Sequence, residues 1–176
     1  PEYWGQKGHY GVAFLSKEKP NKTVKGFKTD TEEDQKRFIE CSFTSNGKEI
    51  TIMNGYFPQG ESIHHETKFP KKIKYYADLK KHIMDLQKKQ ENLIVMGDFN
   101  VAPEDIDIGI LPESINRWLK SGKTSFQPKE IEMWNSIKDL GFVDSWREKY
   151  PNDSSIYSWF DYRSRMFDDN PKRGLR

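Results

Sequence analysis

The sequence predicts a mixed α/β protein, because strand-like and helix-like patterns of apolar residues alternate along the chain. Ile50 and Ile52 recur with a period of two, as on one face of a strand. Phe69, Ile73 and Tyr76 recur at the four- and three-residue spacings of a helix. Strands interspersed with helices indicate layers of sheet covered by helix. The periodicity by itself supports this class and no finer architecture.

The first part of the chain is predicted to be rich in strands. Residues 10–16 have the pattern of a strand, and residues 37–43 are predicted to pair with residues 49–56. The connection between the paired segments contains Asn46-Gly47, which is a strong signal for a two-residue hairpin turn.

A long helix is predicted to follow the hairpin. The apolar repeat that begins at Phe69 continues to Leu86, and Pro70 is acceptable because it would lie in the first turn. The helix leads into a further predicted strand at residues 93–96.

A second helix is predicted in the C-terminal half. Apolar residues recur at helical spacing from Ile131 to Leu140, and Pro128 lies near the start of this repeat. Gly141 follows the last apolar position and is a typical C-terminal stop.

One domain over residues 1–176 is predicted, since no repeat, low-complexity tract or long linker divides the chain. The 29 basic and 27 acidic residues nearly balance, so bulk charge does not argue for a nucleic-acid partner. No apolar run approaches membrane-spanning length, and no membrane partner is expected. The single Cys41 cannot form an internal disulfide, which fits a cytoplasmic protein.

The candidate functional site follows one of the predicted strands. The apolar run stops at Gly97, and Asp98 and Asn100 come next, two residues apart. On an extended segment residues two apart face the same way, so a carboxylate and a carboxamide would share one site past a buried strand. Alternatively, this segment is a turn, since Gly, Asp and Asn are common turn formers. A second polar segment, residues 54–61, also follows a predicted strand and favours one shared rim.

Several segments, in order along nearly the whole chain, resemble the exonuclease III and abasic-site endonuclease family of metal-dependent phosphodiesterases. The matching segments are residues 5–13, 54–61, 97–100 with 105–109, 117–123 and 158–163. The resemblance implies a four-layered α/β sandwich of the endonuclease/exonuclease/phosphatase type, incomplete at both ends of this chain. Family members also carry an N-terminal Asn and metal-binding Glu, and a C-terminal Asp followed by an Asp-His pair. No residues here match those, so the fragment alone is expected to be inactive.

The resemblance assigns catalysis to Tyr56, Asp98 and Asn100. Hydrolysis of a phosphodiester requires an activated water, a divalent cation and donors aimed at the non-bridging oxygens. By resemblance Asp98 is the general base, Asn100 orients water and phosphate, and Tyr56 donates its phenol proton to a phosphate oxygen. Asp98 and Asn100 are also the expected metal ligands, for Mg²⁺ or alternatively Mn²⁺. Without the family pattern, Tyr56 would be interpreted as a tyrosine at the edge of the core.

An aromatic and basic segment near the C-terminal end is the predicted DNA contact. Trp159, Phe160 and Arg163 lie close together, as in a loop that wedges into a minor groove or fills the gap of a missing base. Core packing of Trp159 is the alternative. Gln59 is a further candidate contact. Basic residues supply sequence-independent affinity for phosphates, although each could equally be a solvated surface charge, and the candidates are Arg37, Lys68, Lys120 and Lys123.

Other polar residues are given structural roles. Asp105 and Asp107 are predicted to cap and turn the chain after the candidate site. His82 is predicted to lie on the polar side of its helix, and the histidines lack the spacing of zinc ligands. Pro171-Lys172 departs from the family pattern, which leaves the geometry of that loop open.

The resemblance therefore implies a DNA-repair nuclease that removes nucleotides from 3′ ends of duplex DNA and cleaves on the 5′ side of abasic sites. The expected partner is double-stranded DNA, especially abasic sites and 3′ ends, and the protein is expected to act as a monomer. One alternative is a non-catalytic DNA-binding module on the same fold. Another is a related phosphodiesterase for RNA, inositol phosphates or sphingomyelin, against which the segment at residues 158–163 argues.

Overall fold

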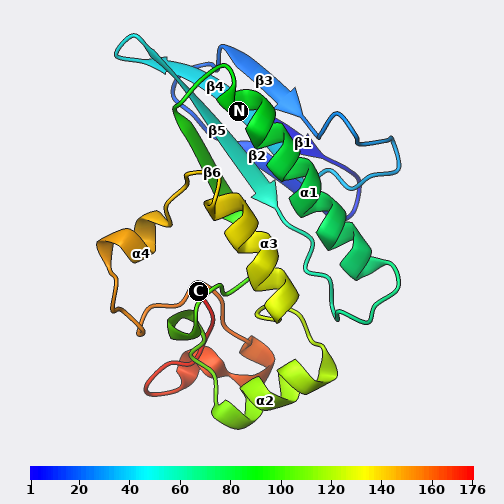
Figure 1. Ribbon diagram of the computed structural model, residues 1–176, viewed down its shortest axis with the longest axis vertical. Helices are drawn as coiled ribbons and strands as arrows, with labels where there is room; N and C mark the ends of the chain where they lie inside the picture. The colour runs from blue at the N-terminus through cyan, green and yellow to red at the C-terminus, as the bar shows by residue number, and fades with distance from the viewer. The chain divides into compact units, whose positions relative to one another are not determined.

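The computed structural model describes all 176 residues, which fall into two compact units (Figure 1). Unit 1 comprises residues 1–58 and 74–99, and unit 2 comprises residues 59–73 and 100–176. The α/β class predicted from the sequence is confirmed. The strands and helices are β1 (Glu2–Gly5), β2 (Gly11–Phe14), β3 (Lys22–Lys25), β4 (Phe38–Ser45), β5 (Lys48–Tyr56), α1 (Lys68–Gln87), β6 (Leu93–Asp98), α2 (Pro112–Ser121), α3 (Pro128–Lys138) and α4 (Ser145–Lys149).

Unit 1 is built on a four-stranded sheet with the order β3-β4-β5-β6. The first three strands are antiparallel neighbours, whereas β6 runs parallel to β5, as a crossover through a helix allows. The predicted hairpin is confirmed. Asn46 and Gly47 have φ angles of 50° and 74°, and Ser45 pairs directly with Lys48 across the turn.

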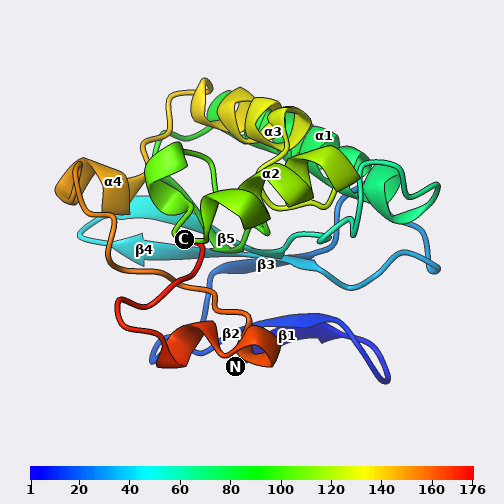
Figure 2. The same cartoon turned by 90° about the horizontal axis from the view of Figure 1, so that it is seen from below.

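A small second sheet covers one face of the larger sheet in unit 1, and α1 lies along the other face (Figure 2). The strand predicted at residues 10–16 is confirmed as β2, which pairs with β1 in antiparallel register. Phe14 of β2 forms a buried cluster with Ile39 and Cys41 of β4, and Ile52 of β5 packs against this cluster.

The predicted long helix is confirmed as α1, and its aromatic stripe packs in unit 1. The ring of Tyr75 lies 5.1 Å from that of Phe27 and 4.7 Å from that of Phe57. The prediction that places His82 on the polar side of this helix is wrong. Its Nε2 atom lies 2.5 Å from a carboxylate oxygen of Glu40, whose side chain is 1% exposed. A buried carboxylate is costly without a partner, and the helix turns His82 toward it.

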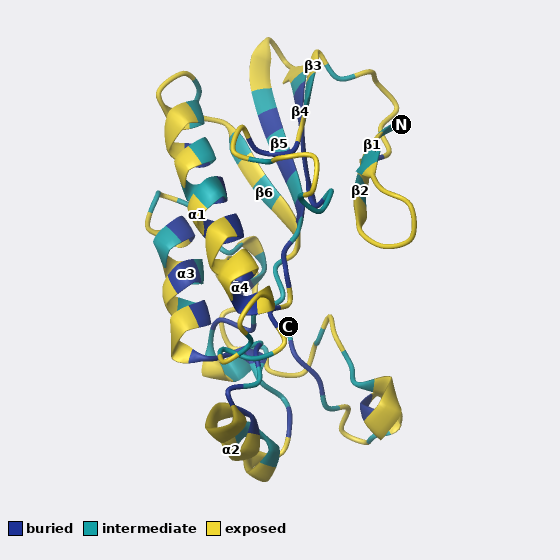
Figure 3. Ribbon diagram, turned by 90° about the vertical axis from the view of Figure 1, so that its right-hand side faces the viewer, coloured by how far each residue is buried: buried dark blue, intermediate teal, exposed yellow.

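The strand predicted at residues 93–96 is confirmed as β6, but the prediction that it is buried is wrong. Ile94 and Met96 are 47% and 45% exposed, and Figure 3 shows exposed positions along the strand. The physical reason is that β6 ends the strand order, with β5 as its neighbour on one side. An apolar run indicates a strand without showing what covers it.

Unit 2 consists of helices and long loops. The predicted second helix is confirmed as α3, which begins at Pro128, and Gly141 beyond its end has a φ of 99°. The helix α2 is missing from the predictions although its signals are present, with Pro112 in the first turn and Gly122 at the C-cap with a φ of 71°. No helix in the chain has both the length and the apolar character needed to cross a membrane. One buried hydrophobic cluster of unit 2 is formed by Ala102, Ile110, Trp118, Phe126, Met166 and Leu175.

Candidate active site

Tyr56 and Asp98 lie side by side in unit 1. They are register partners in the parallel ladder of β5 and β6, each as the last residue of its strand. The N–H of Phe57 donates to the carbonyl of Asp98 over 2.9 Å and extends the pairing past the strand ends. The prediction of a shared rim is confirmed for this pair, because carboxyl ends of neighbouring parallel strands meet at one edge of a sheet.

The register of this pair depends on two facing glycines. Gly55 and Gly97 are partners one position before Tyr56 and Asp98. A Cβ atom added to Gly97 would collide with the carbonyl oxygen of Gly55, and Gly97 has a φ of 127°. The missing side chain therefore permits the close approach of the two strand ends.

Arg37 holds the Tyr56 side chain and backbone. Its guanidinium carbon lies 4.5 Å from the ring centroid of Tyr56 and 4.0 Å from that of Tyr10, and a terminal nitrogen donates to the carbonyl of Tyr56 over 3.0 Å. Burial lowers the pKa of Arg37, and the neighbouring tyrosines oppose this shift. At 8% exposure Arg37 packs inside unit 1, so the predicted surface phosphate contact at Arg37 is not what the structure shows.

The segment after Asp98 is not extended, contrary to the prediction. Asn100 has a φ of 52°, in the left-handed region that Asn tolerates better than most residues. The alternation rule for extended chains therefore does not apply at Asn100, and the same-facing arrangement of the two side chains stays a prediction. Asp98 is an exposed residue of unit 1, while Asn100 belongs to unit 2.

Gln59 ties together two loops of unit 2. Its amide nitrogen donates to the hydroxyl of Thr124 over 2.9 Å, and its amide oxygen accepts from the N–H of Glu61 over 2.8 Å. The N–H of Thr124 also donates to the carbonyl of Glu61 over 3.2 Å. Gln59 is exposed, so it combines a loop-forming role with a surface position.

A completely buried ion pair in unit 2 was not predicted. The side chains of Lys72 and Glu130 are both 0% exposed and contact each other directly. The ammonium of Lys72 also donates to the carbonyl oxygen of Asn100 over 2.8 Å. The available signal was the position of Lys72 three residues after Phe69 and four before Tyr76, within the apolar stripe of the predicted helix.

The predicted aromatic segment lies at the surface of unit 2, where Phe160 is partly buried. Trp159 is 44% exposed, and its ring lies 6.5 Å from that of Trp118 in an edge-on arrangement. Its N–H and carbonyl exchange two hydrogen bonds of 2.9 Å with Leu175. Phe160 contacts Phe167 edge to face at 5.1 Å. Arg163 is exposed and lies in a short 3₁₀ turn.

The predicted lysine contacts differ in their surroundings. The ammonium of Lys123 lies 3.3 Å from the ring centroid of Trp118, and burial lowers the pKa of Lys123. Lys68 forms an ion pair with Glu61, and Lys120 is exposed in the last turn of α2. These lysines therefore remain at or near the surface of unit 2, unlike Arg37 in unit 1.

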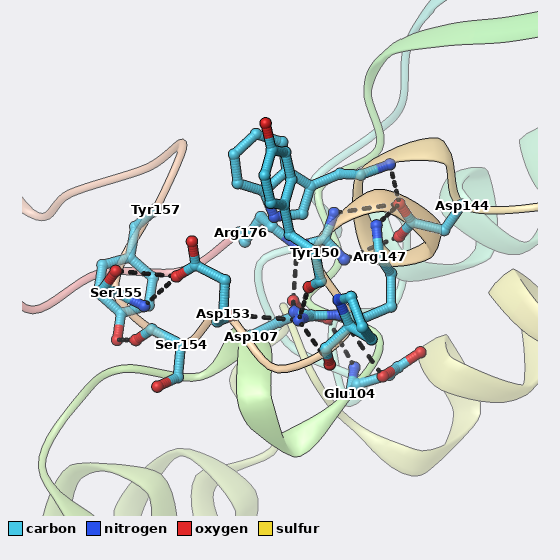
Figure 4. A network of polar contacts seen from close by, with 12 residues as sticks. Glu104, Asp107, Asp144, Arg147, Tyr150, Asp153, Ser154, Ser155, Tyr157 and Arg176 are labelled. Carbon is cyan, nitrogen blue, oxygen red and sulfur yellow. Dashed lines mark hydrogen bonds and ion pairs between the residues drawn. The ribbon is translucent and has the colours of Figure 1, made fainter.

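A polar network anchors Arg176 (Figure 4), and backbone hydrogen bonds of the preceding residue, Leu175, reach Ser158 and Trp159. Asp107, whose side chain is 0% exposed, accepts from Arg147 over 2.5 Å and from Arg176 over 2.6 Å. Arg176 also donates to Asp144 over 2.7 Å. The predicted structural role of Asp107 is confirmed, since its carboxylate also accepts from the N–H of Glu104 over 3.2 Å.

This chain does not bring several metal-binding side chains together in one place. No group of three or more His, Cys, Asp and Glu side chains is arranged to hold an ion. Mg²⁺ is often held by one or two carboxylates together with waters and substrate phosphates, so the exposed carboxylate of Asp98 suits one such position. Asn100 offers a carboxamide oxygen, which is also a suitable ligand type.

Comparisons with known proteins agree with this architecture. The chain is 49% identical over 172 residues to the exodeoxyribonuclease III of Haemophilus influenzae, which covers 98% of this chain and 64% of that protein. It is 28% identical over 171 residues to an exodeoxyribonuclease of Bacillus subtilis, covering 96% of this chain and 63% of that protein. The chain thus spans a little under two thirds of the length of these relatives.

Solved structures with the same fold are also similar. A 3′-5′ exonuclease from Neisseria meningitidis has a TM-score of 0.83 and 32% identity, covering 99% of this chain and 64% of that chain. An AP endonuclease from Archaeoglobus fulgidus has a TM-score of 0.81 and 31% identity, covering 99% of this chain and 63% of that chain. The model of the endonuclease/exonuclease/phosphatase family matches residues 3–173. The chain belongs to the endonuclease/exonuclease/phosphatase family.

Proposed function

We propose that this protein is a DNA-repair nuclease of the exodeoxyribonuclease III type, which hydrolyses phosphodiester bonds at 3′ ends and abasic sites of duplex DNA. The observation that carries the proposal is the placement of Tyr56 beside Asp98 at the ends of two paired parallel strands. The 49% identity to the Haemophilus enzyme supports the same activity. The AP endonuclease fold relative supports action at abasic sites.

The proposed chemistry uses a base and a donor from neighbouring strands. Asp98 accepts a proton from the attacking water, and Tyr56 donates a hydrogen bond to a non-bridging phosphate oxygen. Asn100 orients the water and the phosphate. Mg²⁺, or Mn²⁺ in its place, would offset the negative charge of the phosphate and would be held by Asp98, with Asn100 as a second ligand.

The proposed DNA contacts lie in unit 2. Trp159 and Phe160 offer aromatic surface, and Arg163 offers an exposed guanidinium. Gln59 is exposed in its loop and is proposed to contact DNA. Phosphate contacts are proposed for the lysines at or near the surface, which are Lys68, Lys120 and Lys123. The partner is double-stranded DNA, the protein acts as a monomer, and its proposed location is the cytoplasm.

The proposal is tested with the full protein on a panel of substrates. These are a duplex with one abasic site, a 3′-recessed duplex, a matched RNA duplex and an inositol phosphate, each with Mg²⁺ and with a chelator. We expect metal-dependent cleavage of both DNA duplexes. Asp98→Asn keeps the shape of the side chain and should lower turnover by roughly two to four orders of magnitude, the usual scale of a general acid or base, while DNA binding persists.

Two outcomes would contradict the proposal in different ways. Tight binding of abasic duplex with no cleavage by the wild-type protein would indicate a non-catalytic DNA-binding module. Hydrolysis of RNA or inositol phosphate in preference to DNA would indicate a phosphodiesterase with another substrate. Near-normal hydrolysis by Asp98→Asn would remove Asp98 from the role of general base.

A further inference from the structure

Lys72 is a charged residue placed where an apolar residue would be expected. It lies in the first two turns of α1, and its side chain is 0% exposed. Burial of an ammonium is costly unless an opposite charge and hydrogen bonds compensate it. Glu130, in the first turn of α3, provides that charge and is equally buried.

Both carboxylate oxygens of Glu130 have hydrogen-bond partners. One oxygen contacts Lys72, and the other accepts from the N–H groups of Ser125 and Gln127 over 2.8 and 2.9 Å. Two backbone amides thus bind Glu130 in addition to Lys72. The ammonium of Lys72 is held at a defined position by a fixed partner.

Lys72 also contacts backbone carbonyls of the two site loops. Its nitrogen donates to the carbonyl of Asn100 over 2.8 Å and to that of Gln59 over 3.3 Å. An ammonium has three donors, and these carbonyls together with Glu130 match that number. One buried side chain thus joins the loop that follows β5 to the loop that follows β6.

Stability alone does not account for this arrangement. A buried ion pair is often no more stabilising than apolar residues of similar volume, which a helix stripe readily accommodates. Asn100, by contrast, has a left-handed φ of 52°, a conformation that persists when its surroundings hold it. The ammonium of Lys72, which donates to the carbonyl of Asn100, helps to hold this conformation.

We propose that Lys72 is a positioning residue that sets the backbone of Asn100 relative to the Gln59 loop and so orients the Asn100 carboxamide. This inference rests on the proposed function, because it gives Asn100 a task in hydrolysis. Lys72 itself contacts no substrate. Its effect on turnover passes through the backbone that it holds.

The test compares Lys72→Met with Glu40→Gln in the full protein. Lys72→Met keeps the length of the side chain and removes its donors. Glu40→Gln changes another buried carboxylate, which contacts His82 in unit 1, and serves as the matched control. Turnover and KM on abasic duplex with Mg²⁺ are measured at a temperature well below the melting point of every variant.

We expect Lys72→Met to lower kcat by about 100-fold, the scale of a misplacement of about 1 Å, with KM changed far less. Glu40→Gln should leave kcat within a few-fold for a similar loss of melting temperature. Equal effects of the two variants on kcat would overturn the proposal. If Lys72→Met fails to fold, Lys72→Met combined with Glu130→Gln removes both buried charges and takes its place, with the same expected loss.

Backbone hydrogen exchange provides a readout that does not depend on activity. The N–H of Ala102 donates to Ser125, and the N–H of Ile63 donates to Gly122. Both amides should exchange faster in Lys72→Met than in the wild type, while the amides of α3 keep their wild-type rates. In Glu40→Gln the amides of Ala102 and Ile63 should also exchange at the wild-type rate. Unchanged exchange at Ala102 and Ile63 would overturn the proposal. Absence of cleavage by the wild-type protein would instead refute the proposed function, and exchange alone would then decide the role of Lys72.

Discussion

The position of the Tyr56 side chain is set by contacts on its ring and its backbone. Arg37 lies over the ring and also donates to the Tyr56 carbonyl. The hydroxyl of Tyr75 donates in turn to the carbonyl of Arg37 over 3.1 Å. Both partners are buried, so the position of the Tyr56 ring is set from inside unit 1.

The first prediction concerns Tyr56→Phe. This change keeps the ring and its contact with Arg37, so the melting temperature should stay close to that of the wild type. The loss of one donor aimed at a phosphate oxygen should lower turnover by roughly two to three orders of magnitude. Single-turnover cleavage of abasic duplex measures the effect, and Tyr3→Phe, at a tyrosine that is 69% exposed, is the control. Wild-type turnover in Tyr56→Phe would exclude the donor role.

Trp159 is the residue on which damage recognition is predicted to depend. If its ring occupies the space of a missing base, Trp159→Ala should weaken binding to abasic duplex by about 1 to 3 kcal/mol, as for base-aromatic stacking. Binding to intact duplex should change less. Fluorescence anisotropy with both duplexes measures the difference. An equal loss on both would mean that Trp159 only packs its loop, and a large drop in melting temperature would identify it as a core residue.

At the scale of elements, the candidate site is an alignment of strand ends. The Asn46-Gly47 turn sets the register of β4 and β5, because a two-residue hairpin loop fixes which residues pair across it. The parallel partner β6 comes after α1, and its register with β5 places Gly97 opposite Gly55. A shift of one residue would separate Asp98 from Tyr56 and turn its side chain to the other face.

Gly97→Ala tests this alignment. The added Cβ would overlap the backbone of Gly55, and the φ of 127° is unfavourable for alanine, so the free energy of unfolding should fall by about 2 kcal/mol or more. Gly141→Ala is the matched control, because Gly141 also has a positive φ but nothing lies within 4 Å of a Cβ there. The control should lose only about 1 to 2 kcal/mol. Chemical denaturation measures both, and equal losses would show that close approach at Gly97 is unimportant.

At the scale of the whole molecule, the chain visits its two units alternately. It leaves unit 1 after Pro58, returns at Lys74 and leaves again after Phe99. In unit 2 the Arg176 side chain reaches Asp107, 69 positions earlier, and also Asp144. The contact between Arg176 and Asp107 joins the two ends of a long segment that includes Trp159. The stability of unit 2 should therefore depend on the charges of this network.

The acid limb of stability should depend on Asp144. Burial raises the pKa of Asp144, but hydrogen bonds from Arg176 and from the N–H groups of Arg147 and Trp146 lower it more, so it lies below its ordinary value. A carboxyl with a lowered folded pKa contributes stability above its unfolded pKa of about 3.9, and this contribution is lost as pH falls through the folded pKa. Asp144→Asn should therefore lower the melting temperature at pH 7.

The pH series supplies the check on this prediction. The difference in melting temperature between wild type and Asp144→Asn should stay nearly constant from pH 7 to about 4 and narrow as pH falls further below the unfolded pKa of about 3.9. Glu132→Gln, in a surface ion pair with Lys129, should differ little from wild type at any pH. A difference for Asp144→Asn that stays constant with pH would mean that its carboxylate charge is not what stabilises unit 2.

Local sequence signals predicted several elements and missed others. The Asn46-Gly47 turn, α1 and α3 were predictable because each depends on residues close together in the chain. The short strands β1 and β3 were not predicted, since four-residue strands carry too few positions to show a period. Asp98 was a candidate from its position after a predicted strand, and Tyr56 from the family motifs; their pairing agrees with the predicted rim.

The sequence by itself determined the α/β class, the order of the main elements and the motifs of the family, because these depend on local pattern and residue identity. Tertiary structure decided which charges are buried. Arg37, His82 and Lys72 belong to residue types that are not usually fully buried, yet each contacts a partner that is distant along the chain. The register of Tyr56 with Asp98 was also decided there, because a parallel ladder across a long helix is set by packing and by a glycine contact that no local rule predicts.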